Sequence, residues 1–227
     1  MTTRRDLLIA GAGAAVAASA AGAAAQAAPA QSGHAVILDE AAFVARIRSG
    51  AKHRQAIGAA RVNDGAALQF AVNTLNGFSS GWNEPVANVQ IAVVLFGSAV
   101  VLGLDDAAWQ SHGLADIVKK FAGDWFTADT SHGNPWSHAA ANAGPRGDRS
   151  IPALVARNVR IAVCNTALGE IANRIVAAGT AAGAGDAFAV QAQLREHVLP
   201  GCDIVPAGIS SVAVLQENGY TYFSAAL

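Results

Sequence analysis

The chain has 227 residues, of which 54 are Ala, and 14 of these Ala lie within the first 30 positions. The hydrophobic share of 52% therefore owes much to a small side chain and to an unusual N-terminus. The other 197 residues are enough to bury the hydrophobic core of one domain, and this length favours one domain over two. The formal net charge is −1, or −2 without Arg4, Arg5 and Asp6, which argues against a basic surface for nucleic acid or membranes.

The first 30 residues have the pattern of an export signal. The Arg4-Arg5 pair precedes a stretch from Leu7 to Ala25 dominated by Ala and Gly, and no charged residue follows Asp6 until Asp39. Small residues suited to cleavage follow at 25–27 and 28–30. Residues 1–30 thus resemble a twin-arginine signal peptide, and we expect export to the periplasm. A membrane-spanning helix is the alternative, but Ala and Gly contribute little transfer energy, so no stable membrane insertion is expected after cleavage.

The mature chain alternates between predicted helices and strands. Within residues 31–50, the spacing of Phe43, Val44 and Ile47 predicts an N-terminal helix from Asp39 to Arg48. Five strands are then expected, at 54–61, 89–96, 159–164, 203–205 and 220–223. Apolar residues at helical spacing predict helices between these strands, around 68–75, 104–109, 114–121, 168–176, 188–197 and from 208 onward.

This alternation predicts the fold class. The run from Val89 to Phe96 is nearly continuously apolar and rich in β-branched residues, as in a strand buried on both faces of a parallel sheet. Residues 51–227 are therefore expected to form one α/β domain, a three-layer sandwich around a mainly parallel five-stranded sheet. Residues 106–154 are expected to be an irregular insertion, because Ser, His, Gly, Asn and Pro dominate from Thr130 to Ser150.

Three segments in the second half of the chain resemble one family. These segments are Asn158 to Leu168 (NVRIAVCNTAL), Asp203 to Ile209 (DIVPAGI) and Leu215 to Phe223 (LQENGYTYF). They are similar to the DsrE/DsrF-like family of small sulfur-relay proteins, with a looser likeness over 54–105. The resemblance implies a five-stranded α/β domain that forms homo-oligomers, often trimers or hexamers. It also implies that Cys164, at the end of the third strand, accepts sulfane sulfur as a persulfide and passes it to a small sulfur-carrier protein.

The position of Cys164 supports this chemistry independently. It would lie at the carboxyl end of a parallel strand and directly before a helix, where open α/β sheets bind ligands. Asn165 or Thr166 would cap that helix, so that its first amides and the positive end of its dipole stabilise a thiolate or persulfide anion. The alternative is that Cys164 is a small buried hydrophobic residue without chemistry.

A disulfide between Cys164 and Cys202 is a further alternative in an oxidising compartment. Cys164 would end the third strand and Cys202 would precede the fourth, so in a parallel sheet they belong to opposite ends. A five-residue strand spans roughly 16 Å, whereas bridged Cα atoms lie within about 7 Å. We therefore expect two separate thiols.

The remaining polar and aromatic residues give no clear signal of a metal or catalytic site. His112, His132 and His138 with Asp124, Asp129 and Asp148 fit no tight ligand spacing, so we predict no metal site, and no cofactor is implied. Trp109, Trp125 and Trp136 would either pack or line a ligand cleft or subunit contact, and Trp82 has the same two interpretations.

The sequence leads to two alternative hypotheses for the function. The first is an exported sulfur-relay protein that carries sulfur on Cys164. The second is a non-catalytic periplasmic ligand-binding or assembly module on the same fold, which uses the Trp-rich segment to hold a small ligand or a partner.

Overall fold

The computed structural model describes residues 34–139, 148–181 and 185–225. The predicted signal peptide, residues 1–30, and residues 31–33 after it lie outside the described residues. Within the described ranges, no helix has the length and apolar character needed to cross a membrane.

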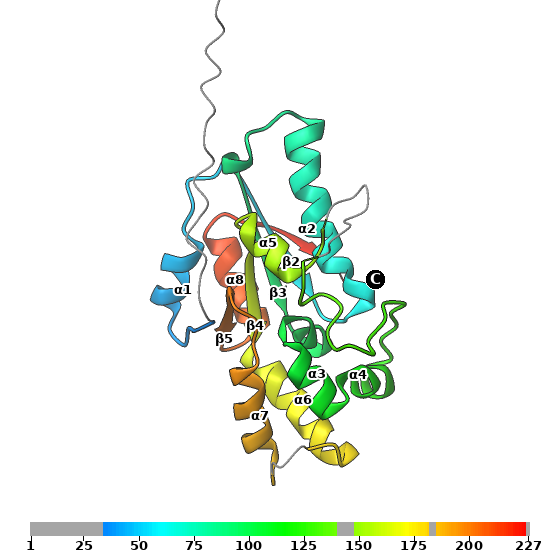
Figure 1. Ribbon diagram of the computed structural model, residues 1–227. Coiled ribbons are helices and arrows are strands. Elements are labelled where there is room, and N and C mark those ends of the chain that lie inside the picture. Colours follow the sequence, from blue (N-terminus) through cyan, green and yellow to red (C-terminus); the bar gives the residue numbers. More distant parts are fainter. Residues whose placement is uncertain (1–33, 140–147, 182–184, 226–227) are drawn as a thin grey trace, which may run out of the picture.

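A six-stranded sheet forms the centre of the domain, and all its strands run parallel in the order β1-β5-β4-β3-β2-β6 (Figure 1). The strands are β1 Ala35–Val36, β2 His53–Ala59, β3 Val89–Leu95, β4 Arg160–Cys164, β5 Cys202–Val205 and β6 Thr221–Ser224. The predicted α/β class is confirmed. The predicted count of five strands is wrong because β1, only two residues long, was missed; it pairs with β5 through Ala35 and Asp203.

Eight α-helices are described, and four of them begin at an Asp or Ser whose side chain accepts a hydrogen bond from the backbone three residues on. The helices are α1 Glu40–Ile47, α2 Ala66–Asn76, α3 Asp106–His112, α4 Leu114–Ala122, α5 Ile151–Ala156, α6 Asn165–Ala178, α7 Ala187–Glu196 and α8 Gly208–Glu217. Shorter helical turns are η1 Asn63–Gly65, η2 Gly77–Gly81, η3 Val86–Asn88 and η4 Gly97–Gly103, of which η2 is a π-helical turn. The predicted helix positions are confirmed within a few residues, whereas α5 and η4 were missed.

The two faces of the sheet are covered unequally. Consecutive strands from β2 to β5 are neighbours, and right-handed crossovers place their connecting helices α2 to α7 on one face. The connections from β1 to β2 and from β5 to β6 cross the sheet in the opposite direction, so α1 and α8 cover the other face (Figure 1). A bidentate ion pair holds α1 on β5, with Arg46 Nη2 2.6 Å from Asp203 Oδ1 and Arg46 Nε 3.2 Å from Asp203 Oδ2.

The central strand β3 is buried along its whole length, as its sequence predicts. Ile91, Val93 and Leu95 belong to the larger core on the α2 to α7 side, and Ala92 and Val94 belong to the smaller core under α1 and α8. A strand buried on both faces is apolar at nearly every position, which explains the apolar run in the sequence, interrupted here only by Gln90.

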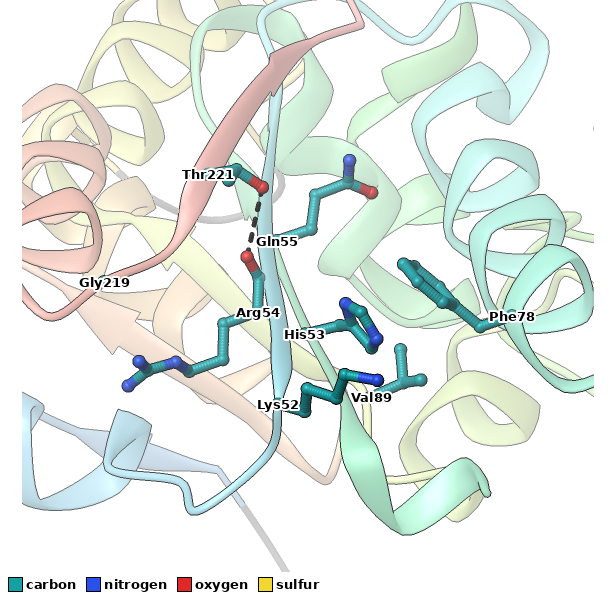
Figure 2. Close-up of a pocket in the computed structure, with 8 residues that line it drawn as sticks. All are labelled: Lys52, His53, Arg54, Gln55, Phe78, Val89, Gly219 and Thr221. Carbon is teal, nitrogen blue, oxygen red and sulfur yellow. Dashed lines mark hydrogen bonds between the residues drawn. The ribbon is translucent and has the colours of Figure 1, made fainter. Parts of the chain in front are cut away.

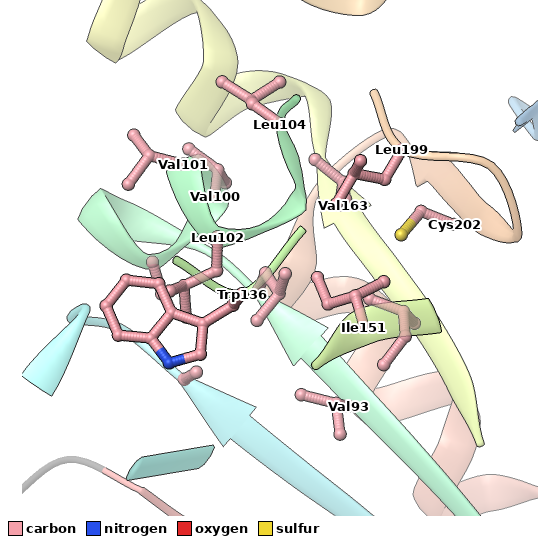
Figure 3. Packing of buried hydrophobic residues seen from close by; sticks show 14 of the residues in the cluster. Val93, Val100, Val101, Leu102, Leu104, Trp136, Ile151, Val163, Leu199 and Cys202 are labelled. Atoms are coloured by element: carbon pink, nitrogen blue, oxygen red, sulfur yellow. The ribbon is translucent and has the colours of Figure 1, made fainter. Parts of the chain in front are cut away.

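The segment 106–154 contributes to the main core. It carries α3, α4 and the start of α5, and the rings of Trp109, Phe126 and Trp136 lie with their centroids 6.2 Å apart in each pair. Figure 3 shows Trp136 packed among aliphatic side chains from β3, η4 and α5. Only 2% of the Trp136 side chain is exposed. The described part of this insertion is therefore an integral part of the domain.

Candidate functional site at the carboxyl end of the sheet

Cys164 ends β4 and is itself the N-cap of α6. Its Sγ accepts a hydrogen bond from the backbone N–H of Ala167 at 3.3 Å. The residue is 4% exposed and belongs to the main core cluster. The sulfur is thus placed at the end of the sheet that the sequence predicts, but it is covered by protein.

Asn165 and Thr166 direct their polar groups away from the sulfur. The Asn165 Oδ1 accepts hydrogen bonds from Arg195 Nε at 2.7 Å and Gln191 Nε2 at 3.1 Å on α7. The backbone N–H and the hydroxyl of Thr166 both donate to the Pro206 carbonyl, at 3.2 and 3.0 Å. These residues therefore fasten the start of α6 to α7 and to the loop before α8.

The amide that donates to the sulfur belongs to Ala167. The prediction that Asn165 or Thr166 is the N-cap is wrong, because the helix already begins at Asn165 and Cys164 is the cap. The side chain of an N-cap residue accepts a hydrogen bond from the backbone amide two or three residues further along the chain. If Cys164 is taken as the N-cap, the sequence therefore identifies the Ala167 amide as the donor.

The two cysteines are free and lie apart, as expected. Cys164 pairs with Val205, and Cys202 pairs with Ile161 at the other end of the short β5. Three residues along a strand span about 10 Å, beyond the reach of a disulfide. Burial raises the pKa of the Cys202 thiol far above its usual range, so this residue stays protonated.

A strained loop follows β2 at the same end of the sheet. Asn63, Asp64 and Gly65 have φ angles of 40°, 51° and 72°, so three consecutive residues occupy the left-handed region, which residues other than Gly seldom adopt. At Gly65, a Cβ would lie 2.3 Å from the Nε1 of Trp136, so only Gly fits against that ring. Packing against the insertion thus maintains the conformation of the loop.

Asp64 ties this loop to residues 125–128. Its Oδ1 accepts from the N–H groups of Thr127 and Ala128 at 3.0 and 3.2 Å, and its own N–H donates to the Trp125 carbonyl at 3.1 Å. Its Oδ2 lies 3.4 Å from Arg149 Nη2, which balances its charge. These contacts fix the backbone around Trp125, which is 60% exposed.

A pocket of about 300 Å³ opens beside this loop. Its wall includes the first turn of α2, and it lies beyond the carboxyl end of β2, where open α/β sheets bind ligands. The lining residues are Asn63, Asp64, Ala66, Gln69, Phe70, Trp125 and Arg149. Trp125 and Phe70 offer aromatic surface, and among the described lining residues the charged ones are the paired Asp64 and Arg149. The sequence identified Trp125 as one of several cleft candidates, but the other lining residues carry no local signal.

Asp124 is buried next to the pocket-forming Trp125. Its Oδ1 accepts from the Val62 N–H at 3.2 Å, and its Oδ2 has no hydrogen-bond partner among the described residues. Burial raises the pKa of this carboxyl, against the opposing effects of Ser98, the Val62 amide and two arginines. Asp124 therefore fastens the start of the segment that carries Trp125 to the Val62 amide, and the burial of its carboxyl group costs desolvation free energy.

The histidines and acids of the insertion are dispersed. His138 pairs with Asp106, while Asp129 and Asp148 each accept from a backbone amide two residues on. Across the described ranges, no three His, Cys, Asp or Glu residues come together in a way that could hold a metal ion.

Comparison with known proteins yields no relative: no family model, no curated protein and no solved structure matches this chain.

Proposed function

We propose that this protein is a non-catalytic binding module that holds a small, uncharged aromatic molecule at the carboxyl end of its sheet. The observation that carries the proposal is the 300 Å³ pocket that the exposed Trp125 lines together with Phe70 and the first turn of α2. Aromatic side chains give a planar ligand a large contact area at a low entropic cost. The internal pairing of Asp64 with Arg149 favours a ligand without net charge.

The test is binding of indole and of phenol to the mature protein, measured by calorimetry. Trp125→Ala should abolish binding of both probes without unfolding the protein. The matched control is Trp82→Ala, because Trp82 is also exposed, at 75%, and does not line this pocket. The proposal fails if neither probe binds the wild-type protein at millimolar concentration, or if Trp125→Ala binds them equally well.

A sulfur relay through Cys164 is the second candidate, and the Ala167 amide on Sγ favours it. The Cys164 thiolate would attack the outer sulfur of a donor persulfide; a new S–S bond forms, the donor's S–S bond breaks, and the donor leaves as a thiolate. A carrier thiol would then take the sulfur in the same way. The burial of Sγ weighs against this reaction, since both attacks need access to the sulfur.

Polysulfide treatment followed by mass spectrometry separates the two candidates. A gain of one sulfur on the peptide that contains Cys164, absent in Cys164→Ser, would support the relay. Rapid alkylation of Cys164 by iodoacetamide at neutral pH would support it further. A Cys164 that reacts with neither reagent would leave the binding module as the better account.

Export and assembly are part of the proposal. We propose that a twin-arginine signal directs the protein to the periplasm, and that the mature chain forms a homo-oligomer, a trimer or hexamer. Fusing residues 1–35 to a reporter tests export, and retention of the reporter in the cytosol would contradict it. Light scattering on the mature protein tests assembly, and a monomeric mass would contradict it.

A further inference from the structure

A second pocket lies at the opposite, amino end of the sheet. β6 pairs with β2 only from Gln55 to Gly58, so the first residues of β2 have no neighbouring strand on that side. A pocket of about 260 Å³ occupies this notch between β2, the start of β6 and the turn η2 (Figure 2). Its lining residues are Lys52, His53, Arg54, Gln55, Phe78, Val89, Gly219 and Thr221.

The notch carries an excess of positive charge. Lys52, His53 and Arg54 are consecutive, and Glu84 pairs with the first two, 3.1 Å from Lys52 Nζ and 3.6 Å from His53 Nε2. Hydrogen bonds from Asn88 and Lys52 hold the pKa of Glu84 below its usual range, so it carries one negative charge. Arg54 Nη1 donates to the neutral carbonyl of Asn218 at 3.0 Å, and no acid among the described residues forms an ion pair with its guanidinium.

One wall of the notch is aromatic. The rings of His53 and Phe78 stack with centroids 4.3 Å apart, and Trp82 meets Phe78 edge-on at 5.0 Å. Phe78 comes from the π-helical turn η2 that follows α2, and such turns recur at functional sites. Figure 2 shows His53 and Phe78 on the same side of β2, while Arg54 extends from the other side toward Gly219.

The volume limits the size of the ligand. At about 30 Å³ for each water molecule, 260 Å³ corresponds to roughly nine waters, which is the space of a molecule with one ring and one small substituent. We propose that this notch binds a small molecule with one planar ring and one carboxylate or phosphate group. The anion lies between Lys52 and Arg54, and the ring lies against Phe78.

Calorimetry with four probes tests this site: benzoate, phenyl phosphate, the neutral isostere benzamide, and inorganic phosphate. We expect benzoate or phenyl phosphate to bind the Trp125→Ala protein, in which the other pocket has lost its exposed aromatic ring, at least roughly tenfold more tightly than benzamide and inorganic phosphate, because a charge-assisted hydrogen bond strengthens binding by about that factor or more. Whichever of the two anions binds more tightly identifies the acidic group.

Variants assign the binding to the notch. Lys52→Gln and Arg54→Gln should each weaken binding of the tighter anion roughly tenfold. The matched control is Lys120→Gln, on the exposed side of α4, which should leave binding unchanged. Trp125→Ala should also leave it unchanged, which separates this site from the pocket at the carboxyl end.

The proposal is overturned if neither anion binds, if benzamide binds as tightly as benzoate, or if inorganic phosphate binds as tightly as phenyl phosphate. It is also overturned if both charge variants, shown to be folded by circular dichroism, bind like the wild type.

Discussion

Replacing Trp136 with Ala tests whether the insertion is part of the domain core. A buried Trp removes about 150–250 Å² from water, which at about 25 cal/mol per Å² gives roughly 4–6 kcal/mol as an upper estimate. Measured truncations of buried aromatic residues cost about 3–5 kcal/mol. Because Trp136 also fills the space against Gly65 and the rings of Trp109 and Phe126, we expect Trp136→Ala to lower the free energy of unfolding by about 4 kcal/mol.

Urea unfolding followed by far-ultraviolet circular dichroism measures this loss without relying on the fluorescence of the deleted residue. The matched control is Trp125→Ala, in the same segment but with an exposed side chain, which should cost less than about 1 kcal/mol. A loss below about 1 kcal/mol for Trp136→Ala, or equal losses for the two variants, would refute the conclusion that this segment belongs to the core.

Three further predictions concern the backbone, a buried acid and the thiols. Gly97→Ala should lower the free energy of unfolding by about 2 kcal/mol or more, because the φ of Gly97 is 52° and a Cβ would lie 2.5 Å from the carbonyl oxygen of Ala60. The control is Gly77→Ala, which should be neutral or stabilising because Gly77 has a helical conformation and open space around its Cα. Burial raises the pKa of the Asp124 carboxyl, so the folded protein binds the carboxyl proton more tightly than the unfolded chain does. The free energy of unfolding should therefore fall as the pH rises from the unfolded pKa of about 3.9 through the higher folded pKa. In urea titrations, Asp124→Asn should lose this part of the pH dependence. Maleimide without reductant should label Cys164 and Cys202 slowly in the native protein and both completely in urea.

Each of these predictions has an outcome that contradicts it. Equal urea midpoints for the two glycine variants would mean that the loop after β3 relaxes around a side chain. A constant stability difference between Asp124→Asn and the wild type across pH 4 to 8 would show that the pKa of this carboxyl is the same in both states. Absence of labelling in urea would reveal a disulfide.

The sequence predicts the layered fold because its strongest signals are long and periodic. The apolar run at Val89 to Leu95 and the helical spacing of Leu68, Ala71, Val72 and Leu75 both correspond to buried faces in the structure. In contrast, β1 has two residues and is held by pairing with β5, far along the chain. No local pattern encodes such a pairing, so it could not be found by periodicity.

The candidate site was less predictable for the same reason. The position of Cys164 at the end of a strand follows from the local sequence, but its burial depends on packing from distant segments. Likewise, the pocket combines Phe70 of α2 with Trp125 and Arg149 of the insertion, which only the tertiary structure brings together. The composition of 130–150 predicted irregular structure, yet Trp136 within it is among the largest fully buried side chains.

The two edges of the sheet have a consequence for when the domain can be completed during synthesis. Among the described strands, the first, β1, pairs with β5, and the last, β6, pairs with β2. Contacts between such distant segments form slowly, and chains are made from the N-terminus. A growing chain can therefore assemble the block from β2 to β4 early, but it closes both edges only after nearly all of the protein has left the ribosome.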